Sequence, residues 1–582
     1  MVGQILWARV CSLFCQTFRR WLALAAGFYV LTVAVSAQSF NVLYTFSGVS
    51  TDPVGGNPSS LLLSSNGNFY GTCVNEGAQQ WGALYEITAT GTPTPLYSFT
   101  NGPAPYDGAN PFAALTEGTN GLLYGLAQSG GSNGVGAIFE VSTNGAFTSL
   151  ISFLREKGAH STNANGAFPK FPMVLNANNG NFYGTAVNGG ANGFGTVFQV
   201  THQGKVTVFY SFSNNVDGAY PQAGLLPYTN GMLYGTAIDG GSNGYGTVFQ
   251  LTAAGRVTPI YSFTNGSDGA NPQGALIDGQ DGQLYGTCTA GGSNGTGTIF
   301  KITTNGVLTA LYAFGVPTQF PGTAGVDNQY NADGINPMGL LLGRDGNFYG
   351  VAHYGGLNGS GSIFQFTQTG MLNILYAFNY SGGQANSDGA NPTSLLEYEN
   401  GNFYGTAFDG GTNNTGTFFT IGVTPTITVQ PTNQAIALNG NASFSLTATG
   451  AQSYQWQFDG TNLLDATDTT LSITNAQIAD AGSYQAIVTN INGTVTSSVV
   501  TLSITNVPGS FLSETGDLQH TNGEFSLTLT DLTGQSGIVI EASTDLIQWT
   551  PIYTNPPGFG TAGFVDSAAG SFPNRFYRAI TP

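Results

Sequence analysis

The sequence predicts an all-β fold that begins with a seven-bladed β-propeller, whose last blade the N-terminal strand closes, and continues into two smaller β-domains. Three observations lead to this prediction. A short phrase, NGNFYGT in its first copy, occurs seven times. Its copies are spaced by 51 to 64 residues, and each copy lies among four apolar runs. A period of this size with four short strands per unit is typical of propeller blades.

The phrase marks the second strand of each predicted blade. Its tyrosines are Tyr70, Tyr124, Tyr183, Tyr234, Tyr285, Tyr349 and Tyr404. An Asn-Gly or Asp-Gly pair opens every copy and predicts a two-residue type I′ hairpin, because both residues tolerate a positive φ. Packing between near-identical units explains seven identical tyrosines better than ligand binding does. The alternative is that they line a binding channel.

The two ends of the repeat region predict how it closes. The run Leu43–Phe46 (LYTF) matches the fourth strand of a unit but has no unit before it. The last unit stops at Gly416–Val423 without a fourth strand. The N-terminal strand can therefore complete the last blade and remove open sheet edges, which otherwise promote aggregation. We expect the propeller to span residues 38–423.

The connections between blades hold the candidate ligand-binding residues. Five connections end in DGANP or a close variant, and their acids are Asp107, Asp217, Asp268, Asp333 and Asp388. Asp52 is a looser match, and the third unit has Asn165 instead. Aspartates gathered on one face are suited to a cation such as calcium or to sugar hydroxyls. The alternative is an Asp-Gly turn that caps its own backbone. No calcium-loop motif is present, so calcium is a weak candidate and no other cofactor is expected.

Signals for catalysis are weak. The four histidines, His160, His202, His353 and His520, stand in unrelated contexts, and neither an HExxH motif nor a GxSxG nucleophile elbow is recognised. Two long connections, Leu154–Phe168 with its charged run Arg155–Lys157 and Gly315–Ile335, break the repeat pattern, and long loops on rigid scaffolds often carry function. We expect no enzyme. The alternative is a polysaccharide hydrolase or lyase that uses carboxylates of the propeller face.

The N-terminus predicts export. Arg19 and Arg20 precede the apolar run Trp21–Ala37, which ends in small residues, so we expect a signal peptide at 1–37 with cleavage before Gln38. An uncleaved anchor is the alternative, although 17 residues are few for a membrane span. Cleavage removes three of the 12 basic residues and none of the 30 acidic ones, so the net charge changes from −18 to −21. This charge disfavours nucleic acid and anionic membranes as partners and favours cations or neutral sugars.

Two cysteines remain after cleavage, Cys73 and Cys288, at equivalent positions of different units. Positions in separate blades are too far apart for a disulfide bond. We therefore expect two free, buried thiols.

The composition changes at about residue 424. The stretch 424–506 contains Trp456 in YQWQFDG and the motif DAGSY at Asp480–Tyr484. It resembles an immunoglobulin domain of the intermediate set, which has a buried tryptophan and a tyrosine corner. The resemblance places the family's two half-cystines at Leu446 and Ala486, so a hydrophobic pair replaces the disulfide. Residues 507–582 are predicted to form a small β-module.

The repeat unit, with NFYGT followed by GG-x-NG-x-GTVF, resembles the GloVer tandem repeat of Gloeobacter and Verrucomicrobia. The resemblance implies a repeat protein with varied surface anchors and no assigned activity, although the final RFYRAITP contains no obvious anchor. We predict an extracellular or cell-surface protein, or alternatively a periplasmic one, that binds a glycan or an extracellular protein without catalysis. A purely structural role in the envelope is the alternative to a binding role.

Overall fold

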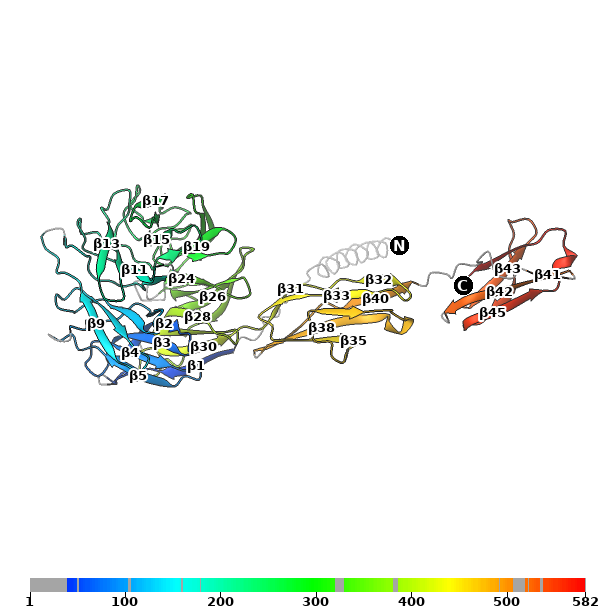
Figure 1. Cartoon of the computed structure of the whole chain (residues 1–582), viewed down its shortest axis with the longest axis horizontal. Helices are drawn as coiled ribbons and strands as arrows, with labels where there is room; N and C mark the ends of the chain where they lie inside the picture. Colours follow the sequence, from blue (N-terminus) through cyan, green and yellow to red (C-terminus); the bar gives the residue numbers. More distant parts are fainter. Residues whose placement is uncertain are drawn as a thin grey trace, which may run out of the picture. The chain divides into compact units, whose positions relative to one another are not determined.

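Seven four-stranded antiparallel sheets make up the repeat region of the chain (Figure 1). The structure is a computed structural model that describes residues 39–49, 52–102, 106–158, 161–177, 179–319, 329–379, 386–490, 492–505, 519–521, 523–533 and 537–580. We number the sheets 1 to 7 in the order in which the chain enters them. Each is a meander in which successive strands pair with each other.

Sheets 1 to 6 take their four strands from consecutive stretches of sequence. Sheets 1 to 3 contain β2 (Gly56–Leu63), β3 (Phe69–Asn75), β4 (Ala83–Ile87) and β5 (Pro93–Ser98); β6 (Thr116–Glu117), β7 (Leu123–Ala127), β8 (Ala137–Val141) and β9 (Phe147–Ser152); and β10 (Val174–Asn176), β11 (Asn181–Ala186), β12 (Thr196–Val200) and β13 (Val206–Ser211). Sheets 4 to 6 contain β14 (Leu226–Pro227), β15 (Leu233–Ala237), β16 (Thr247–Leu251) and β17 (Val257–Ser262); β18 (Ile277–Asp278), β19 (Gln283–Cys288), β20 (Thr298–Thr303) and β21 (Leu308–Ala313); and β24 (Ile335–Leu342), β25 (Phe348–Tyr354), β26 (Ser362–Phe366) and β27 (Leu372–Ala377). Two short strands, β22 (Thr318–Gln319) and β23 (Gln329–Tyr330), pair with each other in the connection from sheet 5 to sheet 6.

Sheet 7 combines the two ends of the repeat region. It contains β28 (Ala390–Glu397), β29 (Asn402–Asp409) and β30 (Thr417–Gly422), and its fourth strand is β1 (Ser39–Thr45). β1 pairs antiparallel with β30, with Ser39 opposite Gly422 and Thr45 opposite Thr417. The N-terminal strand thus supplies the strand that the last unit lacks.

This topology contradicts the predicted seven-bladed β-propeller. Each sheet is a separate set of four strands, and no sheet among the described residues is closed or curled. Turn residues and strand periods determine only which neighbouring strands pair within a unit. How one sheet lies against another depends on side-chain packing, which the period does not contain. We therefore describe the region as an array of seven separate sheets.

The Asn-Gly turns also differ from the prediction. In sheet 1 the Gly67 amide donates to the Ser64 carbonyl at 2.9 Å, and Gly67 has a φ of +82° whereas the φ of Asn66 is not positive. The side-chain oxygen of Asn66 accepts a hydrogen bond from the Asn68 amide at 3.0 Å, which fixes Asn66 in this conformation. The turn is a type I turn followed by a left-handed glycine, so the predicted type I′ hairpin is wrong.

The phrase tyrosines are structural. Their exposed fractions lie between 0 and 7 %, so they do not line an open channel. Each hydroxyl bonds the Asn or Asp four residues earlier. Asn120 Nδ2 donates to the Tyr124 hydroxyl at 2.9 Å, whereas the Tyr285 hydroxyl donates to the Asp281 carboxylate at 2.8 Å. The repeated phrase therefore attaches the second strand to the turn that precedes it.

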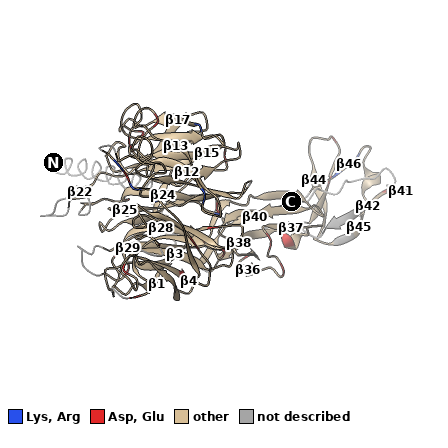
Figure 2. Ribbon diagram, turned by 60° about the vertical axis from the view of Figure 1, so that its left-hand side comes forward, with Lys and Arg blue, Asp and Glu red and all other residues tan. Residues whose placement is uncertain are grey.

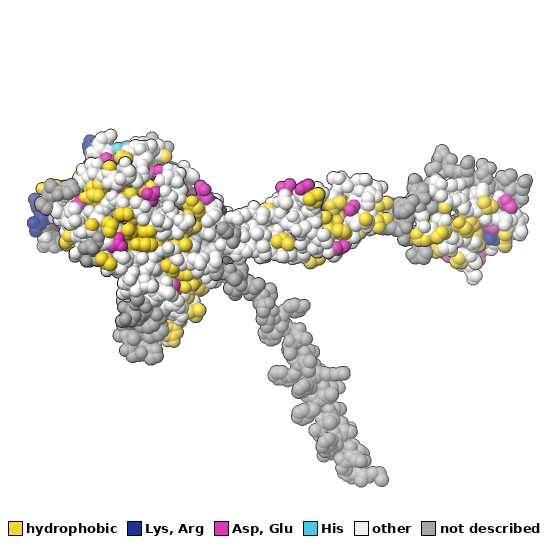
Figure 3. Space-filling model, turned by 90° about the horizontal axis from the view of Figure 1, so that it is seen from below, with side chains coloured by type: hydrophobic (Ala, Val, Ile, Leu, Met, Phe, Trp, Pro, Cys, Tyr) yellow, Lys and Arg dark blue, Asp and Glu magenta, His cyan; other side chains and the backbone are white. Residues whose placement is uncertain are grey.

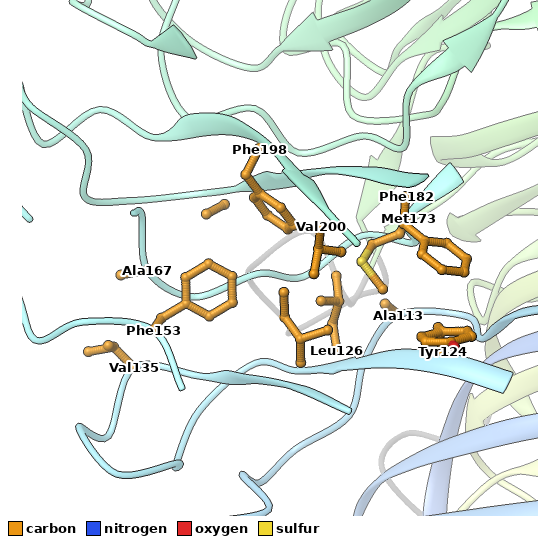
Figure 4. Close-up of a cluster of buried hydrophobic side chains, with 12 residues drawn as sticks. Ala113, Tyr124, Leu126, Val135, Phe153, Ala167, Met173, Phe182, Phe198 and Val200 are labelled. Atoms are coloured by element: carbon orange, nitrogen blue, oxygen red, sulfur yellow. The ribbon is translucent and has the colours of Figure 1, made fainter. Parts of the chain in front are cut away.

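The hydrophobic core lies between the sheets. One cluster combines Tyr124 and Leu126 of sheet 2 with Phe182 and Phe198 of sheet 3 (Figure 4). Among the described residues, six further clusters also take their side chains from two sheets each. Five of these join successive sheets, and the sixth joins sheet 7 to sheet 1. A single sheet cannot bury its apolar surface alone, so each depends on its neighbours.

A glycine–proline contact also connects the sheets in pairs. The glycine before each third strand has no room for a Cβ, because the proline at the start of another unit lies against it. The seven pairs are Gly82–Pro111, Gly136–Pro169, Gly195–Pro221, Gly246–Pro272, Gly297–Pro337, Gly361–Pro392 and Gly416–Pro58. Six pairs join a sheet to the next one along the chain, and the last joins sheet 7 to sheet 1.

The immunoglobulin-like domain confirms the residues on which its prediction rested. Its strands are β31 (Thr426–Val429), β32 (Gln434–Ala437), β33 (Ala442–Ser445), β34 (Thr447–Thr449), β35 (Ser453–Phe458), β36 (Thr461–Asn462), β37 (Thr470–Ile473), β38 (Gly482–Asn490), β39 (Gly493–Thr496) and β40 (Val500–Thr505). Trp456 is fully buried, and its indole N–H donates to the Asp468 carbonyl at 3.0 Å. The Tyr484 hydroxyl donates to the Asp480 carbonyl at 2.7 Å and forms the tyrosine corner. Leu446 and Ala486 are both buried, as a hydrophobic pair at the half-cystine positions should be.

The C-terminal residues form two three-stranded sheets. Their strands are β41 (Gln519–Thr521), β42 (Glu524–Thr533), β43 (Ile538–Ser543), β44 (Thr550–Asn555), β45 (Phe559–Asp566) and β46 (Phe576–Ile580). Ile538, Ile540 and Phe564 form the buried centre of this module. Arg578 pairs with Glu541, and Arg575 pairs with Asp566, each at 2.7 Å.

The chain divides into two compact units. One holds the seven sheets and ends at Thr426, and it also takes in residues 448–452 and 489–495; the other begins at Ile427. The boundaries 38–423, 424–506 and 507–582 stay predictions. The predicted signal peptide at 1–37 lies outside the described residues. Within the described ranges, no helix is long and apolar enough to cross a membrane. Cys73 and Cys288 are free and buried, as predicted.

Candidate functional site

The five predicted ligand-binding aspartates lie in the connections that lead into sheets 2, 4, 5, 6 and 7. All five are buried, with exposed fractions between 0 and 8 %; they are Asp107, Asp217, Asp268, Asp333 and Asp388. Each belongs to a different connection, and no two of them share a hydrogen-bond donor. Each carboxylate therefore has its own set of donors.

Each carboxylate is held by donors of its own connection. Asp217 accepts from the Tyr210 hydroxyl at 3.0 Å, the Ser213 amide at 2.8 Å and the Ser213 hydroxyl at 2.6 Å. The other four repeat this arrangement with a fourth-strand tyrosine at 2.7 to 3.0 Å and a backbone amide. The tyrosines are Tyr97, Tyr261, Tyr312 and Tyr376.

The tyrosine hydroxyls respond to this environment. Burial, and after it the neighbouring carboxylate, raises the pKa of Tyr210 to about 12 and that of Tyr261 to about 12. The same two causes raise the pKa values of Tyr97, Tyr312 and Tyr376. The phenols therefore stay protonated and donate to the carboxylates at neutral pH. The contacts match the alternative in which each aspartate caps the backbone of its own connection. The tyrosine that donates to each carboxylate was not predicted. The ligand-binding role of the five aspartates stays a prediction.

Two connections lack the tyrosine–aspartate pair. Where sheet 2 leads into sheet 3, Ile151 replaces the tyrosine and Asn165 the aspartate. Asn165 Oδ1 still accepts from the Leu154 amide at 2.9 Å. In the first connection Val54 stands at the aspartate position, and Asp52 accepts from the Val54 amide at 2.9 Å. At positions 151 and 165 the tyrosine and the aspartate are replaced together. This joint replacement is a sequence signal that could have revealed the pairing.

The described residues contain no group of three His, Cys, Asp or Glu that could hold a metal ion. Burial, and after it the charge of Asp52, raises the pKa of the Glu76 carboxyl. Its Oε2 is buried without a hydrogen-bond partner and occupies the space where a Cβ on Gly56 would stand. The other six units have glycine at the position of Glu76 and Ala or Ile at that of Gly56. In the first unit the larger side chain is therefore at Glu76 and the glycine at position 56, the reverse of the other six units, and Glu76 fills the space that Gly56 leaves.

The histidines lie apart. His202 bonds the Tyr124 hydroxyl at 3.0 Å, and His353 lies against the Pro392 carbonyl at 3.2 Å. His160 lies outside the described residues.

A second set of residues, which the sequence analysis did not single out, follows the prolines that join the sheets. We call it the post-proline series, and it consists of Ser59, Phe112, Lys170, Gln222, Gln273, Met338 and Thr393. The residue before each proline has a positive φ, between 52° and 57°, and its amide donates to the loop between the second and third strands of another sheet, as Asn110 does to the Trp81 carbonyl at 2.9 Å. The backbone of the series is therefore fixed, whereas its side chains differ from unit to unit.

Contacts connect the members of the series. The Ser59 hydroxyl donates to the Phe112 carbonyl at 2.8 Å, and Lys170 Nζ lies 4.5 Å from the centre of the Phe112 ring. Gln273 Nε2 donates to Gln222 Oε1 at 3.4 Å. Thr393 Oγ1 donates to the carbonyl of Pro58, the residue before Ser59, at 3.3 Å. Side chains far apart in the sequence thus lie side by side, and all except Ser59 are partly exposed.

The charges of the repeat region are few and spread out. Figure 2 shows isolated Lys, Arg, Asp and Glu residues along the ribbon, without a cluster of one sign. On the face seen in Figure 3, hydrophobic side chains gather over the repeat region among uncharged polar ones, with few acidic or basic groups between them.

Comparison with known proteins supports both resemblances. The model of the Gloeobacter/Verrucomicrobia repeat matches residues 25–164 and 160–329, and that of the immunoglobulin domain matches residues 424–490. No curated protein shows a significant match to the chain.

Among solved structures, the chain is similar to titin M4 in its trigonal form, with 26% identity over 14% of this chain and 96% of that one and a TM-score of 0.14. It is also similar to titin M3, with 19% identity over 14% and 97% and a TM-score of 0.13. A third is the I-band fragment I67–I69 of titin, with 15% identity over 25% and 64% and a TM-score of 0.16.

The repeat match extends over more than half of the 582 residues. It covers sheets 1 to 5, where the phrase, the tyrosine–aspartate pairs and the glycine–proline contacts recur. The predicted repeat family and the predicted immunoglobulin-like domain are both confirmed. The chain belongs to the Gloeobacter/Verrucomicrobia repeat family.

Proposed function

We propose that this protein is an exported, non-enzymatic glycan-binding protein whose binding surface is the post-proline series. Repeats joined to an immunoglobulin-like domain are typical of adhesion and structural proteins. One observation carries the proposal: the series is a fixed backbone position whose side chain varies within otherwise near-constant units. Constant residues explain the scaffold, so the varied ones are free to serve recognition.

The side chains of the series suit a sugar. The amides of Gln222 and Gln273 and the hydroxyl of Thr393 supply donors and acceptors for sugar hydroxyls. Phe112 adds an aromatic surface. The series contains no carboxylate, and neither glycoside hydrolysis nor calcium binding is expected from it.

The remaining parts fit this role. The immunoglobulin-like domain and the C-terminal module would act as a spacer between the binding surface and the cell envelope. The predicted signal peptide would bring the protein outside the cytoplasm. A protein ligand is the second class of partner, and the same surface would serve it.

A glycan array probed with the purified protein tests the proposal. We expect reproducible binding to at least one glycan and its loss in the double variant Gln222→Ala/Gln273→Ala. The matched control is Gln203→Ala/Gln368→Ala, which removes two exposed glutamines from the turns between third and fourth strands and should leave binding unchanged.

Three results would reject the proposal. A folded protein that binds no glycan would favour a structural role in the envelope or a protein partner. Loss of binding in Asp268→Asn/Asp333→Asn but not in the glutamine variant would return the site to the aspartates. Release of new reducing ends from a bound glycan would show a hydrolase.

A further inference from the structure

Lys170 is the exception within the post-proline series. The other six members are uncharged, and the two series members that follow it along the chain are glutamines. Lys170 stands in the sequence FPKFP, between Phe168-Pro169 and Phe171-Pro172, so two prolines restrict the backbone around it. Lys170 is thus the one charge among seven equivalent positions, and its backbone is rigid. Such a departure from the repeat is expected where one specific ligand is bound.

The ammonium group is partly buried and has no acidic partner among the residues that the structure describes. Its Nζ lies 4.5 Å from the ring centre of Phe112 and 5.8 Å from that of Phe171. Both ion pairs found among the described residues belong to the C-terminal module, so no described carboxylate neutralises Lys170. Burial lowers the pKa of Lys170 below its usual value.

Packing alone does not explain a lysine here. Removing a cation from water costs free energy, and contact with an aromatic face offsets only part of that cost. Glutamine at the equivalent positions 222 and 273 meets the structural demand without this cost. A residue that the fold would be better without is a candidate for function.

The geometry points to Lys170 as the binding residue for a carboxylate of the ligand, so we propose that the glycan is an acidic one that contains uronic acid. This inference rests on the proposed glycan-binding function. The lysine offers three N–H donors and a full charge in a partly desolvated position, where a charge-assisted hydrogen bond is strong. Gln222 and Gln273 would bind hydroxyls of neighbouring sugar units.

The net charge, −18 for the full chain and −21 after the predicted cleavage, opposes an anionic ligand at long range. At about 0.1 M salt, however, charges further apart than about 10 Å are largely screened. The local charge at Lys170 therefore decides the interaction at contact distance. We expect the affinity for an acidic glycan to increase as salt rises from low to moderate concentration, because screening first removes the general repulsion.

The test measures calorimetric binding of trimers of galacturonic, glucuronic and mannuronic acid. Each is compared with its carboxyl-reduced form, which keeps the sugar chain but replaces the carboxylate by a hydroxymethyl group. We expect Lys170→Gln to weaken binding of the preferred acidic trimer by about ten- to a hundredfold, and to change binding of the reduced trimer less than about twofold. Lys301→Gln is the matched control, because it removes the same charge at a position where three other sheets carry glutamine, Gln199, Gln250 and Gln365.

A second readout separates a functional lysine from a structural one. Because burial disfavours the charged side chain, Lys170→Gln should leave the melting temperature unchanged or raise it. A lower melting temperature would assign Lys170 a structural role and overturn the inference.

Other outcomes are also decisive. Equal binding of acidic and reduced trimers, or acidic binding that survives Lys170→Gln, would reject the uronic-acid ligand while leaving glycan binding intact. Failure of all trimers together with a silent glycan array would reject the proposed function itself. Lys170-dependent binding of a poly-glutamate peptide without binding of any trimer would replace the glycan by an acidic protein.

Discussion

The repeat sheets and the immunoglobulin-like domain both bury aromatic side chains, but against different partners. In the repeat region each core cluster is shared between two sheets, as Tyr124 and Phe198 share theirs. In the immunoglobulin-like domain Phe444 packs against both Trp456 and Tyr484 within one domain. A sheet of the array therefore needs its neighbours to bury its apolar side chains, whereas the immunoglobulin-like domain buries them within itself.

The largest effect is expected from removing a shared aromatic ring. Phe198→Ala should lower the free energy of unfolding of the repeat region by about 3–5 kcal/mol, because it leaves a cavity in the fully buried cluster between sheets 2 and 3. Hydrogen exchange should increase in both sheets. Phe444→Ala, which also empties a buried site, should increase exchange in its own domain alone. Loosening of sheet 3 without sheet 2 would contradict the dependence between neighbours.

A smaller effect is expected from the tyrosine–aspartate pairs, which occur in the repeats but not in the immunoglobulin-like domain. Asp217→Asn should cost the repeat region about 1–3 kcal/mol, because the amide cannot accept all the donors that hold the carboxylate. Urea denaturation measures the change. A cost below about 0.5 kcal/mol would show that the connection is held without its carboxylate.

Alkaline pH should weaken the repeat region more than the immunoglobulin-like domain. Burial raises the pKa of Tyr210, Tyr261 and Tyr484 to about 12, compared with about 10 in an unfolded chain. Because the folded value is the higher one, each protonated phenol contributes its full stabilisation below about pH 10, and this is lost as pH rises to about 12. The repeat region holds more such tyrosines. Its melting temperature should therefore fall more between about pH 10 and 12, and Tyr210→Phe should reduce that fall. Equal falls in the two regions would contradict this.

The smallest effect is expected at the turns of the phrase. Asp281→Asn should change the free energy of unfolding by less than about 0.5 kcal/mol, because five sheets carry asparagine at this position and reverse the direction of the hydrogen bond to tyrosine. The substitution is chemically the same as Asp217→Asn. The two variants therefore differ only in whether the carboxylate is buried, as at Asp217, or exposed, as at Asp281. Equal costs for the two would show that burial of the carboxylate does not matter.

Local features of the fold could be predicted from the sequence, whereas contacts across units could not. The strands and their pairing within a unit follow from spacing, because these depend on neighbouring residues. The pairing of β1 with β30 is the exception, because an unmatched strand at each end of the repeat region predicts it. The type I turn at Asn66 was missed because a side-chain hydrogen bond, and not backbone tolerance, decides its φ. Lys170 was not predicted, because the candidate residues were chosen for their recurrence in several units. Lys170 occurs in one unit alone.

Seven similar units of four strands before an immunoglobulin-like domain follow from the amino-acid order, since turn chemistry and alternation act over a few residues. The roles of the polar residues emerge only when the sheets pack. Packing places tyrosine hydroxyls on the five aspartates and leaves Lys170 over an aromatic ring without a described acidic partner. The physical reason is that the fate of a charge depends on burial and on the donors around it, and these come from residues that the chain brings together only when its sheets pack.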